Sequence, residues 1–367
     1  MALGALGSGL AGLFQSCIRV DRRSEAALVL TGMTGSIAGL LPSPVLAVLL
    51  FHELSITGRP FDFTLDSLVA TETYVPGSSL QDHDYMEQIT LCGAAASVAY
   101  IATQLLVPPS LYPWKEPYPL EGSFAPWHLA VAIPLGLVCG KVGSLALILK
   151  SLFGQVRVKT CAWLQEQAKC PPWLSILIFP TLAGVLHGLL AVANPFLAGT
   201  GTSVALRFVQ QEEEGQQFGK LWLLGTAFLK VVSMSMCLGF GLTGGPLFPL
   251  GFAGICIGMA MSTSMFPLCL TVPCCICATV GSFVPIPFTL VWLVGSIFDL
   301  SPQQMGPPLV SAFVAFTFTG GTGVLKRLGE KRLGVVVPDP RTHNRDESDD
   351  DILASIRSAV FGSYSEL

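Results

Sequence analysis

The feature that most constrains the fold is a stretch without charged residues that runs from Val231 to Phe298. The hydrocarbon core of a bilayer is about 30 Å thick, and about 20 apolar helical residues cross it. The stretch is therefore long enough for several membrane-buried segments. The rest of the chain agrees, because 51% of its 367 residues are hydrophobic and only 12% are charged. We expect an all-α polytopic membrane protein embedded in a lipid bilayer, with no indication of which membrane holds it.

Apolar segments alternate with polar links along the chain. Several segments are too short for a full crossing, and three clusters of Lys and Arg mark links expected on the cytoplasmic side. The links at 55–87 and 210–217 are acidic, and we expect solvated, irregular loops there. The expected membrane segments are 2–16, 26–41, 43–54, 88–107, 127–150, 173–194, 219–240, 246–266, 269–282, 285–298 and 305–321.

Two short patterns occur twice in the same order, which indicates two related halves. Pro42-Ser43-Pro44 before an apolar run returns as Pro285-Ile286-Pro287, 243 residues later. Leu3-Gly4-x-x-Gly7 returns as Leu250-Gly251-x-x-Gly254, 247 residues later. The expected organisation is a membrane domain at 1–332, with an incomplete first repeat at about 1–107 and a second at about 127–321, and a polar, disordered tail at 333–367.

Residues 241–252, GLTGGPLFPLGF, cannot form an ordinary spanning helix, because they contain four glycines and two prolines. Unpaired backbone groups in hydrocarbon are unfavourable by several kcal/mol each, so irregular backbone survives there only where it lines a cavity or binds something. Pro249 suits the first position of a helix that continues from Leu250 to Phe266. The start of that helix then presents N–H groups and a positive dipole end inside the membrane, which attracts anions. A glycine-rich packing kink is the alternative interpretation.

The contacts that we expect for such an anion are the amides of Leu247 and Phe248, with Gly244 and Gly245 permitting close approach and Pro249 starting the helix. No Lys or Arg lies nearby in the sequence. Partial charges on amides allow faster exchange than a buried cation, so the pattern favours conduction of a small monovalent anion over capture of a metabolite.

These residues resemble a signature of the chloride channel and chloride/proton exchanger (CLC) family, G-G-x-F-x-P, with Leu247 in place of the Phe. Residues 31–54 are similar to a family run that includes Gly32, Gly35, Pro44 and Glu53, and the resemblance extends over about residues 1–330. Later matches are Pro287, Thr289, Asp299 and the Gly-rich break from Asn194 to Gly201. The resemblance implies an inverted-repeat bundle with re-entrant half-helices, transport of chloride or another small anion, and a homodimer with one pore per subunit. It implies no cofactor, metal or nucleic-acid partner.

The chain also departs from the family pattern. The family's first two motifs, one of which carries the gating glutamate, are expected before Leu3, so Gly4 and Gly7 are possible gate-helix neighbours. Glu53 is a further possible neighbour of the pore, and the proton-relaying glutamate that follows it in exchangers is Leu54 here. Apolar residues around Leu325 replace an anion-contacting tyrosine, and Pro246 removes one amide.

The leading hypothesis is a chloride channel-like protein rather than an enzyme, since no catalytic constellation is apparent. The alternatives are a non-conducting remnant or regulatory subunit of the same fold, which the departures favour, and a chloride/proton exchanger. An apolar Leu54 cannot carry a proton, which disfavours coupled exchange.

Other conspicuous residues are expected to be structural. The cysteines of Pro273-Cys274-Cys275-Ile276-Cys277 are expected to pack as small apolar side chains, with a metal site as the minor alternative. His52 and Glu53 are expected to form a packed or interfacial pair, with a proton relay as the alternative. Lys230 is expected to reach the membrane interface, and it is a functional candidate if it faces the bundle instead. Glycines at 32, 35 and 39 allow neighbouring helices to approach closely. The stretch Gly140-Lys141-Val142-Gly143-Ser144 resembles the family's second motif with Val in place of Glu, but its position contradicts the family order, so we expect a Gly-rich helix there.

Overall fold

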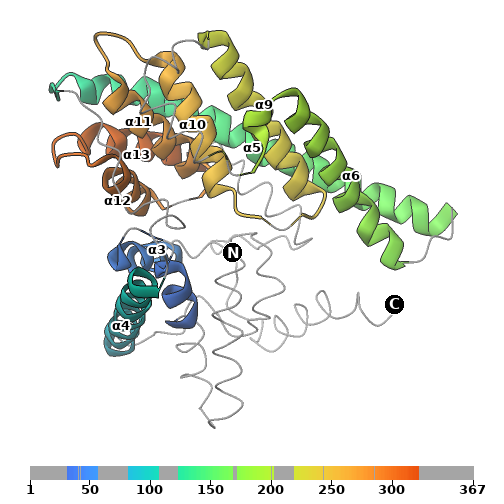
Figure 1. Ribbon diagram of the computed structural model, residues 1–367, viewed down its shortest axis with the longest axis horizontal. Coiled ribbons are helices and arrows are strands. Elements are labelled where there is room, and N and C mark those ends of the chain that lie inside the picture. The colour runs from blue at the N-terminus through green and yellow to red at the C-terminus, as the bar shows by residue number, and fades with distance from the viewer. Residues whose placement is uncertain are drawn as a thin grey trace, which may run out of the picture. The chain divides into compact units, whose positions relative to one another are not determined.

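The computed structural model confirms the all-α prediction for the residues that it describes, where all regular structure is helical (Figure 1). These residues are 31–39, 41, 43–56, 82–106, 123–167, 172–199, 201, 219–242, 244–284 and 286–321. Residues 31–38 form a helical segment. The further helices are α3 (Pro44–Ile56), α4 (Asp82–Leu106), α5 (His128–Gln167), α6 (Pro172–Ala193), the short 3-10 helix η3 (Pro195–Leu197), α9 (Lys220–Gly239), α10 (Leu247–Met261), α11 (Leu268–Gly281), α12 (Pro287–Phe298) and α13 (Gly306–Gly321).

The helices fall into two length classes. Among the described residues, three are long and apolar enough to cross a membrane: Ile89–Leu106 within α4, His128–Leu164 within α5, and α9. In contrast, α10, α11 and α12 contain 15, 14 and 12 residues. At a rise of 1.5 Å per residue they are about 22, 21 and 18 Å long, shorter than the hydrocarbon core. The expectation of membrane segments too short to span is therefore confirmed.

The short helices α10 and α11 lie at the centre of the packing. Helix α10 contacts α9 and α11, while α5 lies along α9, α11 and α13 (Figure 1). Every residue of α11 from Cys269 to Gly281 is buried. Cys274, Cys275 and Cys277 are fully buried and not disulfide-bonded, so the prediction that they pack as apolar side chains is confirmed.

Glycines allow α10 to approach α11 closely. A β-carbon at Gly254 would lie 2.7 Å from the α-carbon of Ile276, and one at Gly258 would lie 2.6 Å from the α-carbon of Val272. Two glycines four residues apart on one helix face are typical of tight helix pairs in membranes, where close backbone contact replaces the hydrophobic effect as the source of attraction.

Glycines also lie at close helix contacts elsewhere in the bundle. On α5, a β-carbon at Gly140 would lie 3.2 Å from the α-carbon of Ala315 in α13, and one at Gly143 would lie 2.8 Å from the carbonyl oxygen of Thr279 in α11. Lys141, between them, is exposed. Near the first described helix, a β-carbon at Gly39 would lie 2.7 Å from the hydroxyl oxygen of Thr103 in α4.

Three predicted boundaries are wrong, because each prediction placed the end of a helix at the end of an apolar stretch. Helix α5 continues past 150 to Gln167, because Leu, Gln, Arg and Lys are good helix formers and the first proline follows only at Pro171. Helix α4 begins at Asp82, so the last part of the acidic link is helical rather than irregular. Helix α10 ends at Met261 rather than 266, ahead of a turn in which the Thr263 N–H donates to the Phe266 carbonyl.

The internal repeat agrees with the positions at which two helices begin. Helix α3 begins at Pro44 and α12 at Pro287, the second proline of each Pro-x-Pro pattern. Proline suits the first helical position because its missing N–H has no partner within the helix. The other repeated pattern, at Leu3 to Gly7, lies outside the described residues, as do the link at 57–81 and the tail, so the domain boundaries stay predictions.

Alanine substitutions in α10 test the close contact with α11. We expect Gly254→Ala to lower the free energy of unfolding by about 1–3 kcal/mol, because the new methyl group meets backbone atoms that cannot move aside. Gly251→Ala is the matched control, since its β-carbon would lie 4.0 Å from the nearest atom, a side-chain carbon of Ile276. We expect the control to be neutral or slightly stabilising, because Ala favours a helix over Gly. Thermal unfolding in detergent measures both, and equal stability of the two variants would contradict the packing argument.

Candidate anion site

The predicted anion site lies where α10 begins. Gly244 and Gly245 precede the helix and are exposed, and a β-carbon at either would have no described atom within 4 Å. Pro246 is the N-cap residue, with φ −77° and ψ −17°, and its carbonyl accepts a hydrogen bond from the Leu250 N–H at 3.0 Å. The start of α10 is thus approachable from the side of the two glycines.

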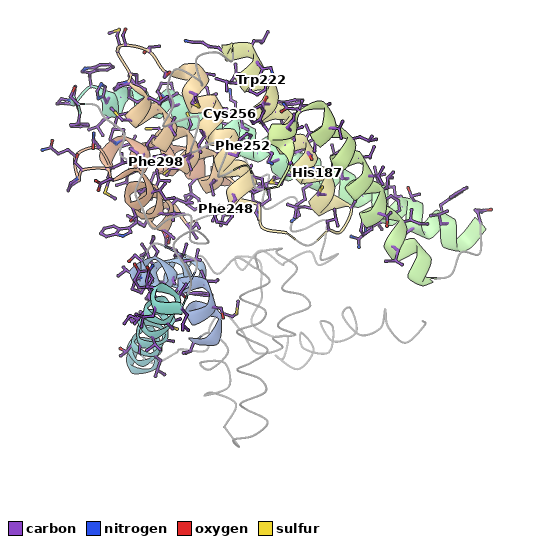
Figure 2. The ribbon with its side chains drawn as sticks, viewed as in Figure 1. His187, Trp222, Phe248, Phe252, Cys256 and Phe298 are labelled. Carbon is purple, nitrogen blue, oxygen red and sulfur yellow. The ribbon has the colours of Figure 1, made fainter. Side chains whose placement is uncertain are left out.

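The helix begins two residues earlier than predicted. Leu247, not Pro249, is its first residue, and Pro249 occupies the third position. A proline is tolerated there because the first-turn amides have no acceptor within the helix. Consequently Leu247 and Phe248 provide the amides at the start of α10, while Pro249 provides none. Phe248 lies at this end of α10, and Phe252 and Cys256 follow it along the same helix (Figure 2).

The connector between α9 and α10 is a compact turn. Gly241 has a φ of 95°, its N–H donates to the Leu238 carbonyl at 3.2 Å, and the Leu242 N–H donates to the Cys237 carbonyl at 2.9 Å. This pair of bonds is the Schellman motif that ends helices, which favours glycine at the left-handed position. A β-carbon at Gly241 would also collide with the guanidinium of Arg157 from α5, so the fold brings a cation against this connector.

A carboxylate of the chain itself occupies the start of α12. Glu53 is only 7% exposed. Its Oε1 accepts the Phe288 N–H at 2.8 Å, while its Oε2 accepts the Thr289 N–H at 2.8 Å and the Thr289 hydroxyl. Hydrogen bonds to an ionised group at a helix start combine charge assistance with the helix dipole. Glu53 is therefore packed, and these hydrogen bonds connect it to α12 rather than to the start of α10. His52 beside it is half-buried.

Lys230 does not reach the membrane interface, so this prediction is wrong. Its side chain is 2% exposed, and its Nζ donates to the carbonyls of Leu197 and Gly199, each at 2.7 Å. These carbonyls belong to the Gly-rich break after α6, where the backbone has left the helix. They give the ammonium group partners inside the bundle, so it has no need to extend to water.

Some of the predicted neighbours cannot be assessed. Gly4, Gly7 and Leu325 lie outside the described residues. The isolation of Lys230 in an otherwise apolar helix was the signal that made it a functional candidate if it faced the bundle. No local pattern pointed to the contact of Glu53 with α12, because the two lie 235 residues apart.

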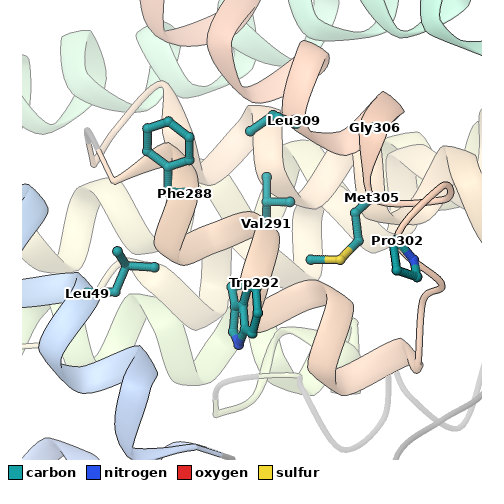
Figure 3. A pocket seen from close by; sticks show the side chains of 8 residues that line it. All are labelled: Leu49, Phe288, Val291, Trp292, Pro302, Met305, Gly306 and Leu309. Carbon is teal, nitrogen blue, oxygen red and sulfur yellow. The ribbon is translucent and has the colours of Figure 1, made fainter.

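A cavity of about 370 Å³ is lined by residues of α3, α12, α13 and the turn between α12 and α13, and by none of α10 (Figure 3). Apolar side chains dominate its lining, and none of the lining residues is charged, so it offers little to an anion. The lining residues are Leu49, Phe288, Val291, Trp292, Pro302, Met305, Gly306 and Leu309.

A bundle of membrane-spanning and short internal helices, with one short helix starting beside exposed glycines, defines a membrane transport fold. The chain belongs to the voltage-gated chloride channel family, whose sequence model matches residues 1–320. The predicted family is confirmed, and with it the assignment to integral membrane proteins that transport anions.

Two solved structures share the fold. A CLC-type fluoride/proton antiporter is 18% identical with a TM-score of 0.58, and the match covers 86% of this chain and 68% of that one. A slow cyanobacterial Cl⁻/H⁺ antiporter is 17% identical with a TM-score of 0.58, covering 90% of this chain and 70% of that one. No curated protein matched the sequence.

Substitution of Glu53 tests its role at the start of α12. We expect Glu53→Gln to lower the free energy of unfolding by about 1–3 kcal/mol, because the amide nitrogen cannot accept the hydrogen bonds that one carboxylate oxygen accepts. Glu53→Ala should be more destabilising, since it leaves both backbone donors unsatisfied. Thr289→Val is the matched control, because it removes only the hydroxyl contact. Chemical unfolding in detergent measures the series, and a Glu53→Ala variant as stable as Thr289→Val would refute the assignment.

Proposed function

We propose that the protein passes chloride or another small monovalent anion down its gradient through a site at the start of α10. The observation that carries the proposal is the difference between two helix starts in one bundle. The start of α12 is bonded by the Glu53 carboxylate, whereas two exposed glycines, Gly244 and Gly245, lead into the start of α10. The anion would meet the amides of Leu247 and Phe248, with Gly244 and Gly245 leaving room for it and Pro249 fixing the first turn.

Backbone amides suit conduction for an energetic reason. Each carries a partial charge, so a site built from them attracts an anion without binding it so tightly that it leaves slowly. The dipole of α10 adds to this attraction at the same end. Family membership supports anions as the transported class. The family resemblance also implies a homodimer, and we retain it as part of the proposal.

Proton-coupled exchange is the second candidate function. It is favoured by the two solved structures of the same fold, which are both antiporters. Against it stands Leu54, which follows Glu53 where exchangers of the family carry a second glutamate. A leucine has no proton to exchange, so we favour uncoupled flux. A non-conducting regulatory subunit remains the third candidate, since Pro246 removes one amide from the approach to the site.

A bulky side chain in the approach to α10 tests the proposed path. We expect Gly245→Leu to lower chloride flux in reconstituted vesicles by tenfold or more, because the side chain would enter the space from which the anion reaches the Leu247 amide. Stability should change little, since a β-carbon at 245 meets no described atom within 4 Å. Flux is measured as chloride efflux with a chloride electrode.

The matched control for this experiment is Gly225→Leu. Gly225 lies on α9, is exposed and also has no described atom within 4 Å of its β-carbon position. The Gly225→Leu variant should conduct chloride like the unmodified protein. Equal flux in both variants would exclude the start of α10 as the path, and absence of flux in the unmodified protein would favour the regulatory subunit.

Proton movement separates uncoupled flux from exchange. In vesicles with a chloride gradient and no imposed pH gradient, we expect chloride efflux without stoichiometric uphill proton movement, because Leu54 offers no relay. A pH-sensitive dye in the vesicle lumen reports the protons, and a protonophore control removes passive proton leak. Proton transport against its own gradient, driven by chloride, would establish the exchanger instead.

A further inference from the structure

Lys230 is a buried cation directly behind the helix whose start forms the proposed anion site. Its Nζ lies 5.3 Å from the centre of the Phe252 ring, in addition to the two carbonyls that it contacts. Phe252 is 1% exposed and lies one helical turn after Phe248 on the same face of α10. Figure 2 shows these two rings in succession along the helix.

The partners of Lys230 do not neutralise its charge. Leu197 and Gly199 contribute carbonyl groups, and Phe252 contributes the face of a ring. Both bind a cation through partial charges and leave its net charge in place. Among the described residues, no carboxylate is recorded in an ion pair with it. The field of a desolvated charge reaches further inside a protein than it does in water.

From this arrangement we infer that Lys230 is a positioning and electrostatic residue for anion binding, acting on the start of α10 from behind Phe252. The inference rests on the proposed function. Four residues of helix separate Phe248 from Phe252 by about 6 Å, so the ammonium group lies on the order of 10 Å from an anion at the first turn. With an effective dielectric constant of about 20, one charge at that separation changes affinity by on the order of tenfold.

The distance explains why such a cation is compatible with rapid exchange. A lysine in direct contact with the anion would hold it, whereas Lys230 directs two of its three N–H donors to the carbonyls of Leu197 and Gly199. The ring of Phe252 lies beside its ammonium group. Lys230 therefore raises the occupancy of the site without becoming a ligand.

The Gly-rich break from Asn194 to Gly201 is also held in place by hydrogen bonds that do not involve Lys230. Asn194 donates from Nδ2 to the Thr226 hydroxyl at 3.0 Å, and His187 Nδ1 lies 2.6 Å from the Ser233 hydroxyl. Thr226 and Ser233 are one turn before and one turn after Lys230 on α9. These neutral bonds join α9 to α6 and to the break independently of the charge, so the fold has anchors that survive its removal.

The test compares halide binding among variants of the full chain in detergent. Isothermal titration calorimetry with sodium chloride, at ionic strength held constant with sodium gluconate, gives the Kd. We expect Lys230→Met to weaken chloride binding by roughly tenfold and Lys230→Arg to bind within about threefold of the unmodified protein. Lys230→Gln removes the charge but keeps an N–H₂ donor for the carbonyls, so it should bind as weakly as Lys230→Met. A purely structural role would instead let Lys230→Gln retain affinity.

The matched control is Lys220→Met, which removes the same charge from an exposed position on the same helix. It should leave the Kd unchanged. If the unmodified protein binds no chloride, the proposed function fails and takes the inference with it. If the unmodified protein binds and the neutral Lys230 variants bind equally well, only the inference fails. If neither neutral variant folds while Lys230→Arg does, Lys230 is a structural residue and the inference is overturned.

Discussion

The constraint on which this structure depends is that backbone groups inside a membrane have no water to bind. A helix that ends there exposes several N–H or C=O groups, and each must find a partner within the protein. This bundle contains short helices, so it has more such ends than a set of simple spanning helices. Two of them are satisfied by side chains of opposite charge. Glu53 accepts from the N–H groups at the start of α12, and Lys230 donates to the carbonyls that follow α6.

The start of α10 differs from the start of α12, because two exposed glycines precede it whereas the Glu53 carboxylate bonds the start of α12. Two glycines within α10 have a different effect, since Gly254 and Gly258, in the middle and the second half of the helix, bring its backbone against α11. Helix α10 thus has an N-terminus that is reached past exposed glycines, while the rest of the helix is packed closely against α11. The close packing keeps the amide dipoles at the N-terminus in a constant direction.

The sequence allowed much of the fold to be predicted, because hydropathy, glycine spacing and proline positions act locally. The short helices, the packing of the cysteines in α11 and the helix starts at Pro44 and Pro287 all follow from such local signals. The sequence analysis missed the helix ends that lie beyond the apolar stretches. Hydropathy indicates whether a segment is surrounded by lipid, and it does not indicate how far the helix continues into water. The roles of Lys230 and of Glu53 at α12 depend on contacts between distant parts of the chain. A lone lysine in an apolar helix gives the same sequence pattern whether its side chain extends to water or binds carbonyl groups inside the bundle.

The bond between Glu53 and α12 has a consequence for the order of assembly during synthesis. Chains emerge from the ribosome with their N-terminal segments first. Helix α3 is therefore complete long before Phe288 and Thr289, which lie 235 and 236 positions later, have been added. Until then its carboxylate lacks the amides that make its burial favourable. The nascent protein must keep α3 near water, or in contact with the insertion machinery, until α12 has been synthesised, so that α3 docks onto α12 only after that point.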